Sequence, residues 1–258
     1  MTGTAAEPGP HPIHHALARR LADPGGGVVV DLGCGPGRTL IALHHRWPGT
    51  RLIGIDLQPA PLATAGQTDA GARLLLVRAD LAAPLPLDDA GVTALVCHNV
   101  IELLPRPAVL FAEAHRVLRR GGQAVWSHTD FAGLVIHGAD PQLTDRICQA
   151  YAEVSQRWMA HIDPRAGRAM PGLARRAGLT VDAFDAHVLT ADRLTGHASL
   201  RIDEITQVAY RHAAQQRAAV TVHEVQAWRA QLDRAHADGE FCFAETAFIT
   251  TTSRTDRD

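Results

Sequence analysis

The chain has 258 residues, of which 46% are hydrophobic and 20% charged, a composition typical of a folded globular protein rather than a disordered one. Its 25 basic and 27 acidic residues give a formal net charge of −2, which excludes the strong positive field of a dedicated nucleic-acid-binding protein. All the basic residues are arginines, so mechanisms that need a Schiff-base lysine or a P-loop lysine are excluded too.

Cysteine usage and hydropathy indicate the cellular compartment. The four cysteines lie far apart in the sequence and form no C-x-x-C pair, so neither a disulfide framework nor a zinc knuckle is indicated. No apolar run approaches the ~20 residues that span a bilayer. The first twelve residues lack the basic start and apolar stretch of a secretory signal. We therefore expect a cytoplasmic protein with no membrane partner.

Strand and helix patterns alternate through the first half of the chain. In order, these are a helix at 13–21, a strand at 28–32, a helix at 39–47, a strand at 51–56, a short helix at 59–65, strands at 73–78 and 92–97, a helix at 107–119 and a strand at 123–128. Such alternation predicts a doubly wound α/β fold, in which a mostly parallel sheet has helices on both faces.

The rhythm changes after residue 130. Residues 131–177 and 191–237 have helical patterns, and two late strands are predicted at 180–189 and 241–251, as an antiparallel pair at the sheet edge. We interpret the chain as a single domain over 1–258. Its core is expected at 25–130, with a helical cap and substrate region, inserted after the fifth strand, at 131–178 and 191–237.

The segment from Asp31 to Gly37, D-L-G-C-G-P-G, carries the most information about function. Its three alternate glycines let the backbone turn sharply and approach a ligand closely. A dinucleotide site needs G-x-G-x-x-G, but here the sixth position is Arg38, and Pro36 removes an amide that a phosphate would use. The acid at position 31 would repel a phosphate and attract a sulfonium or ammonium group. The loop therefore favours a cationic nucleoside ligand.

This loop resembles motif I of the class I S-adenosylmethionine-dependent methyltransferases, and the resemblance extends in order over about residues 28–130. In that family the glycine loop wraps the amino-acid part of the cofactor. The acid that ends the second strand binds the ribose hydroxyls, and the acid that ends the third strand meets the adenine. The matching residues are Asp56, which lies 25 residues after Asp31, and Asp80.

Two further segments resemble the same family, here of the bacterial small-molecule type. Residues 97–104, C-H-N-V-I-E-L-L, match the segment that lines the cofactor and the mouth of the substrate site, and residues 116–122 resemble its R-V-L-x-P-G-G turn, with Arg120 in place of the common proline. The resemblance implies a Rossmann-like sheet of seven strands and S-adenosylmethionine as cofactor. The residues that it implies for cofactor binding are Asp31, Gly33, Cys34, Gly35, Gly37, Asp56, Leu57, Asp80, Leu81, His98 and Asn99.

Three histidines are candidates for a general base. His128 ends the fifth strand, His98 follows the fourth, and His137 lies in the expected cap. An imidazole with a pKa of ~6.5 suits proton abstraction at cytoplasmic pH. The alternative is that alignment of the acceptor with an already activated methyl group drives the transfer, and that these histidines are polar strand-end residues. Asp130 and Arg168 are candidates for the substrate site, Arg168 as an anion-binding residue or simply as part of a lid helix.

No paired acid cluster follows the fourth strand, so we expect no metal ion. The main hypothesis is a bacterial methyltransferase of secondary metabolism that acts on an oxygen or nitrogen of a small molecule. Three alternatives stay open: a C-methyltransferase of a quinone-like ring, a non-catalytic cofactor-binding regulatory protein, and an NAD-dependent oxidoreductase, which Arg38 disfavours. No nucleic-acid partner is expected, and the oligomeric state is open between monomer and homodimer.

Overall fold

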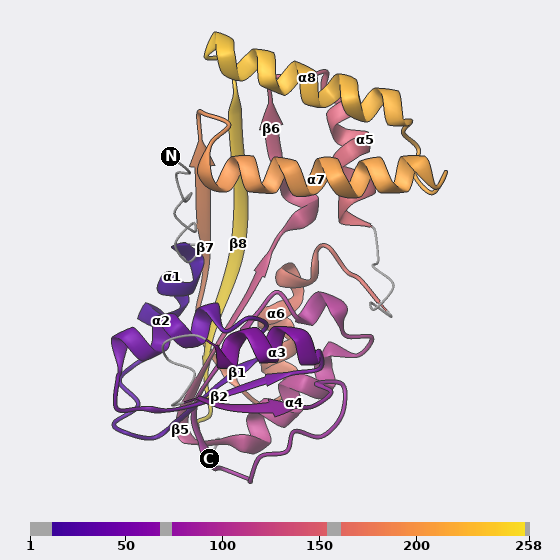
Figure 1. Cartoon of the computed structure of the whole chain (residues 1–258). Helices are drawn as coiled ribbons and strands as arrows, with labels where there is room; N and C mark the ends of the chain where they lie inside the picture. The colour runs from indigo at the N-terminus through magenta and orange to yellow at the C-terminus, as the bar shows by residue number, and fades with distance from the viewer. Residues whose placement is uncertain (1–11, 68–73, 154–160, 256–258) are drawn as a thin grey trace.

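The computed structural model describes residues 12–67, 74–153 and 161–255 (Figure 1). Its strands are Val28–Leu32 (β1), Arg51–Asp56 (β2), Leu74–Arg78 (β3), Val92–His98 (β4), Leu118–Thr129 (β5), Val135–His137 (β6), Thr180–Ala191 (β7) and Cys242–Ser253 (β8). Its α-helices are Pro12–Arg20 (α1), Arg38–Arg46 (α2), Pro59–Gly66 (α3), Pro107–Val117 (α4), Pro141–Ala152 (α5), Met170–Arg176 (α6), Gly196–Ala214 (α7) and Val222–Asp238 (α8). Short 3-10 helices lie at Ile101–Leu103 (η2), Phe131–Gly133 (η3) and Ala166–Ala169 (η4).

The strands form one sheet in the order β3-β2-β1-β4-β5-β8-β6, with β7 paired to β8. β1 to β5 are parallel, and β8 is antiparallel to β5, β6 and β7. The predicted doubly wound, mostly parallel sheet with a late antiparallel pair is therefore confirmed. The sheet has eight strands rather than the expected seven. The additional strand is β6, whose three residues pair with the first residues of β8.

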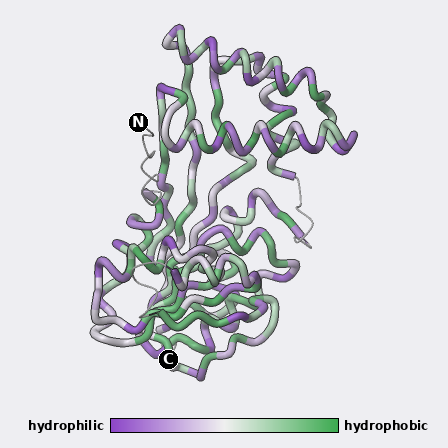
Figure 2. Tube along the Cα trace, in the orientation of Figure 1, coloured by the Kyte–Doolittle hydropathy of each residue, from purple (hydrophilic) through white to green (hydrophobic). Residues whose placement is uncertain are grey.

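Alternate residues of the central strands supply two hydrophobic clusters, one on each face of the sheet. Val29 packs with Leu17 of α1 and Leu40 of α2. Its neighbour Val30 packs on the other face with Phe111 of α4. Helices α1, α2 and α3 thus cover one face, while α4 and α6 cover the other. Figure 2 shows the same concentration of hydrophobic residues in the strands of this lower part of the molecule.

A third hydrophobic cluster lies above the sheet core, among α5, α7, α8 and the upper ends of β6 and β8 (Figure 1). We call α5, α7, α8 and β6 the helical layer. Trp228 of α8 lies at its centre with no exposed surface, and the Trp228 indole N–H donates to Thr144 Oγ1 of α5 at 3.0 Å. β7 and β8 extend from the sheet core into this layer, so it shares strands with the core rather than being attached by a linker.

The boundaries of the helical layer differ from those expected for the cap. Residues 166–178 fall within the expected cap at 131–178, but in the sheet core η4 packs against β5 and η2, and α6 packs against α4. Met170 and Ala174 have no exposed surface there. The physical reason is that α6 buries its apolar side between α4 and the sheet rather than against α7 and α8.

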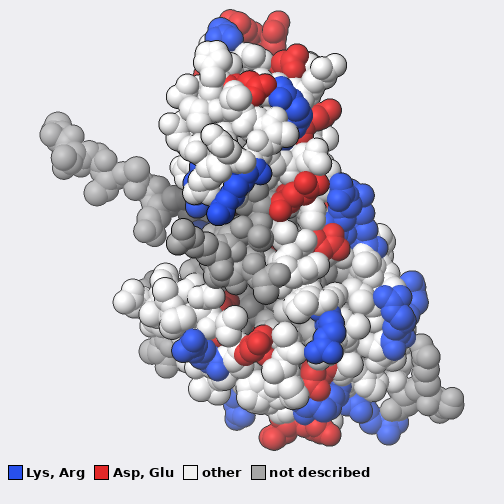
Figure 3. All heavy atoms as spheres, turned by 90° about the vertical axis from the view of Figure 1, so that its right-hand side faces the viewer, with Lys and Arg blue, Asp and Glu red and all other residues white. Residues whose placement is uncertain are grey.

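The surface is mixed in charge on the face that Figure 3 shows, where arginines are interspersed with aspartates and glutamates. Among the described helices, none combines the length and apolar character that crossing a membrane requires.

Candidate active site

The carboxyl ends of β1 to β4 form the floor of a cavity of about 620 Å³. In doubly wound sheets this edge is where ligands bind. Residues from the glycine loop, from the ends of β2 and β3 and from η2 line the cavity: Gly33, Gly35, Asp56, Leu57, Gln58, Pro61, Asp80, Leu81, Ala82, Asn99, Val100, Leu103, Leu104 and Pro105. We refer to it as the first cavity.

The glycine loop between β1 and α2 has positive φ at Gly33, Gly35 and Gly37. A Cβ at Gly33 would lie 2.1 Å from Val100 Cγ2, so this position tolerates no side chain. Gly35 has no atom within 4 Å of where its Cβ would lie, and it lines the cavity. Gly33 thus lets the loop pack on η2, whereas Gly35 leaves open space for a ligand close to the backbone.

Two acids, the partly exposed Asp56 and the buried Asp31, lie beneath the loop. The Asp56 carboxylate accepts the Gly35 N–H at 2.9 Å and the Gln58 N–H at 2.8 Å, which fixes the loop against the end of β2. Asp31 is only 2% exposed, and its Oδ2 has no hydrogen-bond partner among the described residues. Burial, together with the nearby Asp56 charge, raises the pKa of Asp31 to about 8. A buried carboxyl of this kind is stabilised by a cationic ligand.

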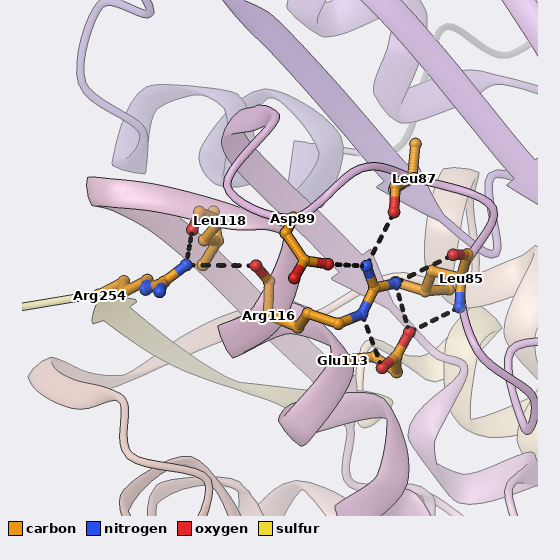
Figure 4. Close-up of polar contacts among 7 residues, drawn as sticks. All are labelled: Leu85, Leu87, Asp89, Glu113, Arg116, Leu118 and Arg254. Carbon is orange, nitrogen blue, oxygen red and sulfur yellow. Dashed lines mark hydrogen bonds and ion pairs between the residues drawn. The ribbon is translucent and has the colours of Figure 1, made fainter.

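The loop after β3, which carries Asp80 and Leu81, is fastened to α4 by Arg116 (Figure 4). The Arg116 guanidinium donates to the carbonyls of Leu85 and Leu87, at 3.0 and 2.9 Å, and to the carboxylates of Glu113 and Asp89. Glu113 in turn accepts the Leu85 N–H at 2.7 Å. Arg116 therefore fixes the loop after β3, whose residues Asp80 and Leu81 line the first cavity, although Arg116 itself does not line that cavity.

A second cavity, of about 590 Å³, lies between the glycine loop and α7. It shares Gly33, Gly35 and Asn99 with the first cavity, so the two meet at the glycine loop. Its lower wall includes Asp31, Cys34, Arg38, His98 and Thr129. Its upper wall consists of Gly196, His197, Leu200, Arg201, Glu204 and Glu245.

A network of charged side chains forms this upper wall. Glu245 of β8 is 3% exposed, and its two oxygens lie 2.7 Å from His197 Nε2 and 2.9 Å from Arg201 Nε. Arg201 also donates through Nη1 to the Tyr151 hydroxyl at 2.9 Å and to Glu204 at 2.6 Å. The network therefore holds His197 and Arg201 in fixed positions over the glycine loop.

Comparisons with known proteins agree with this geometry. Residues 30–126 match a family model described as a methyltransferase domain. An uncharacterized methyltransferase of Mycobacterium ulcerans is 39% identical over 117 residues, and a trans-aconitate 2-methyltransferase of Azoarcus is 40% identical over 95 residues. Residues 30–126 are thus similar to a methyltransferase domain, and we refer to them by that name. These matches cover 45% and 37% of this chain, and they span less than half of the relatives' own lengths, 45% and 36%.

Solved structures resemble nearly the whole chain. A Bacillus halodurans protein superposes with a TM-score of 0.64, at 17% identity, over 95% of this chain and 100% of its own. The [4+2]-cyclase SpnF gives 0.56, at 16% identity, over 95% and 82%. Geranyl diphosphate C-methyltransferase of Streptomyces coelicolor A3(2) gives 0.52, at 16% identity, over 95% and 78%. At such identities the likeness concerns the fold alone, and both the methyltransferase core and the helical layer fall within it.

The methyltransferase domain brings together most of the residues expected to bind a cofactor. Seven line the first cavity: Gly33, Gly35, Asp56, Leu57, Asp80, Leu81 and Asn99. Asp31, Cys34 and His98 line the second cavity. Gly37 lines neither, and instead it begins α2 in a left-handed conformation, with φ 83°. Asn99 is itself at φ 52°, and its side-chain Oδ1 accepts the Thr129 N–H at 2.8 Å.

Two of the three candidate bases lie away from the cavities of the methyltransferase domain. His128 has no exposed surface, and burial lowers its pKa to about 4. Its Nδ1 accepts the Gly167 N–H at 3.2 Å, and its Nε2 lies 3.8 Å from the buried Glu102. His137 is exposed on β6, where it pairs with Cys242. His98, in contrast, lines the second cavity, with Nδ1 3.1 Å from Ser127 Oγ. The geometry therefore does not support His128 or His137 as a base.

The predicted substrate residues pair with each other. Arg168 donates to the Asp130 carboxylate at 2.7 Å, and this ion pair joins η4 to the end of β5. Neither residue lines the first or the second cavity. In the described part of the chain, no three histidine, cysteine, aspartate or glutamate side chains gather as a metal site would need.

Sequence reasoning missed the upper wall of the second cavity. His197 and Arg201 are four residues apart on α7, a spacing that places them on one helix face. Their partner Glu245 comes from β8, 44 residues beyond Arg201, and the sequence carries no signal that pairs them. One clue was available, because Glu245 is the single charged residue of β8.

Proposed function

We propose that the protein is an S-adenosylmethionine-dependent methyltransferase that transfers a methyl group to an oxygen or nitrogen of a small molecule. The observation that carries the proposal is the pair of cavities joined at the glycine loop. The first has the acids and the glycine loop that a nucleoside cofactor needs, and the second offers room for an acceptor beside it. The cofactor's sulfonium makes its methyl group electrophilic when bound.

Asp31 is the physical reason why the site suits a cationic cofactor. Its buried Oδ2 lacks a partner among the described residues, and Asp31 lines the second cavity two residues before Gly33, which both cavities share. A sulfonium or ammonium group there would neutralise the ionised carboxylate, whereas a pyrophosphate would be repelled. This argument favours S-adenosylmethionine over a dinucleotide.

The rest of the first cavity suits the nucleoside. Each oxygen of Asp56 accepts one backbone N–H and retains a second lone pair, which leaves the carboxylate able to accept from two ribose hydroxyls. Asp80 accepts the Ala82 N–H at 2.9 Å and, with Leu81, lines the end of the cavity beside β3. We assign that end to the adenine.

The chain's own part in the transfer is to bind, align and exclude water. Holding the acceptor in line with the methyl and sulfur atoms can supply much of the acceleration. Where the acceptor must lose a proton, His98 is the one of the three predicted bases that lines the acceptor cavity.

Calorimetry with S-adenosylhomocysteine tests this proposal. The unaltered protein is expected to bind it and not NAD. Asp56→Ala is expected to weaken binding tenfold or more, because two hydrogen bonds to a carboxylate, each worth about 1.5–3 kcal/mol, are lost.

The matched control is Asp238→Ala, which removes an exposed acid at the end of α8, outside both cavities, and is expected to leave affinity unchanged. Equal affinity of Asp56→Ala and the unaltered protein would contradict the cofactor assignment. Binding without methyl transfer to any phenol, carboxylic acid or amine of a screen would favour a regulatory protein instead.

A further inference from the structure

The upper wall of the second cavity contains a cation whose hydrogen-bonding capacity is only partly used. Arg201 reaches Glu245 through Nε, and Tyr151 and Glu204 through Nη1. Within the described residues, its Nη2 makes no hydrogen bond. The side chain is 13% exposed and lines the cavity. Two N–H donors of Nη2 are therefore left for a ligand.

Packing keeps the Arg201 guanidinium in this position. Its central carbon lies 5.3 Å from the centre of the Phe131 ring, a cation–π arrangement. Phe131 in turn packs edge-on against Tyr151, at 5.9 Å between ring centres. Because these contacts already fix the guanidinium, the Arg201 side chain loses little further conformational freedom when Nη2 binds a ligand.

The charges around Arg201 decide what it can bind. Both oxygens of Glu245 are already occupied, by Arg201 and by His197, so this acid offers little to a ligand. The Glu204 side chain is 51% exposed, and solvent screens its charge. On the opposite wall, Arg38 is exposed and lines the same cavity. Beside Arg201, the upper wall thus presents the unused Nη2 donors together with one exposed acid, Glu204, whose charge solvent screens.

We propose that Arg201 selects acceptors that carry a carboxylate, which Nη2 binds from the upper wall of the second cavity. This inference rests on the proposed function, because it takes the second cavity as the acceptor site. A carboxylate oxygen accepts a charge-assisted hydrogen bond from an N–H of Nη2, and its charge balances that of the guanidinium. An amide of the same shape lacks the charge and presents donors of its own.

The test uses matched probes on the protein loaded with S-adenosylhomocysteine. Benzoate and succinate are titrated against benzamide and succinamide by calorimetry. The carboxylates are expected to bind at least tenfold more tightly than the amides. In an Arg201→Met, Glu245→Gln double variant, which removes one positive and one negative charge, this preference is expected to disappear, while S-adenosylhomocysteine still binds.

Arg211→Met is the matched control, because Arg211 is exposed on the same helix and lies outside both cavities. It is expected to retain the preference. Carboxylates that bind no better than amides, or a double variant that keeps the preference, would overturn the assignment of Arg201 alone. Failure of the unaltered protein to bind S-adenosylhomocysteine would instead overturn the proposed function.

Discussion

Asp31 shows how a single residue can favour ligand binding at the expense of the empty protein's stability. Its carboxyl is buried without a hydrogen bond to Oδ2 from any described residue. Burial raises its pKa to about 8, from an ordinary value of 3.8. As pH rises between these two values, the unfolded chain releases this proton before the native protein does. The free energy of unfolding of the unliganded protein therefore falls across that range.

Asp31→Asn removes this penalty, because an amide does not ionise. The variant without ligand is expected to unfold at a higher temperature than the unaltered protein, with a difference that grows from pH 5.5 to pH 8.5. Its affinity for S-adenosylmethionine is expected to fall tenfold or more, since the charge that faces the sulfonium is lost. Thermal unfolding and calorimetry check the two effects separately. Unchanged affinity would mean that Asp31 only supports the loop.

At the scale of elements, a hydrogen bond between Gly167 of η4 and His128 of β5 holds the two elements together. The Gly167 N–H donates to His128 Nδ1, which places the proton of the neutral imidazole on Nε2, toward Glu102. A Cβ at Gly167 would lie 3.1 Å from the same nitrogen, so a side chain at this position would require the buried His128 to shift by a few tenths of an ångström. Burial also raises the pKa of Glu102 to about 8. These contacts join β5, η2 and η4 beneath the cavities.

His128→Ala is therefore expected to lower stability rather than cofactor binding. It leaves the Gly167 N–H without its partner, which costs about 1–3 kcal/mol in the free energy of unfolding. Denaturant unfolding measures that loss, and calorimetry should show S-adenosylhomocysteine affinity within about threefold of the unaltered protein, because His128 lines neither cavity. A large loss of turnover with unchanged stability would restore His128 as a general base.

The sequence predicted the strands of the core closely because each is a short apolar run with a turn at its end. The predicted limits of β1 and β2, at 28–32 and 51–56, coincide with those observed. The glycine loop and the acids after β2 and β3 followed from chain order and line the cavities as expected. These features depend on neighbours in sequence, and so local patterns reveal them.

The upper wall of the second cavity and the positions of η4 and α6 depend instead on packing between segments that are distant in the sequence. Helical periodicity identified 166–178 as helical but not which cluster its apolar side joins. The burial of His128 could not be predicted for a similar reason: a strand end can face a cavity or a neighbouring segment, and the partner of His128, Gly167, is 39 residues away in the sequence. Only tertiary structure supplies that information.

At the scale of the whole molecule, the helical layer and the sheet core share two long strands, β7 and β8. The last residues of β8, from Ala247 to Ser253, pair with β5 in the core, and its first three residues pair with β6 in the helical layer. β7 follows β8 along almost its full length. Because the same strands cross both parts, neither can lose its order without disturbing the other, and we expect one cooperative unit.

Two buried tryptophans report on the two parts. Trp126 in the core stacks on Phe111, with ring centres 3.9 Å apart, and Trp228 lies in the helical layer; neither has exposed surface. The chain has four tryptophans, so two triple Trp→Phe variants can each retain one of these. In each, the midpoint of thermal unfolding by tryptophan fluorescence is expected to coincide with that by far-ultraviolet circular dichroism. S-adenosylhomocysteine at a hundred times its dissociation constant should stabilise the folded chain by about 2.7 kcal/mol and shift both midpoints together. A fluorescence midpoint of Trp228 several degrees below the dichroism midpoint of the same variant would show that the helical layer unfolds by itself, and that the shared strands do not couple it to the core.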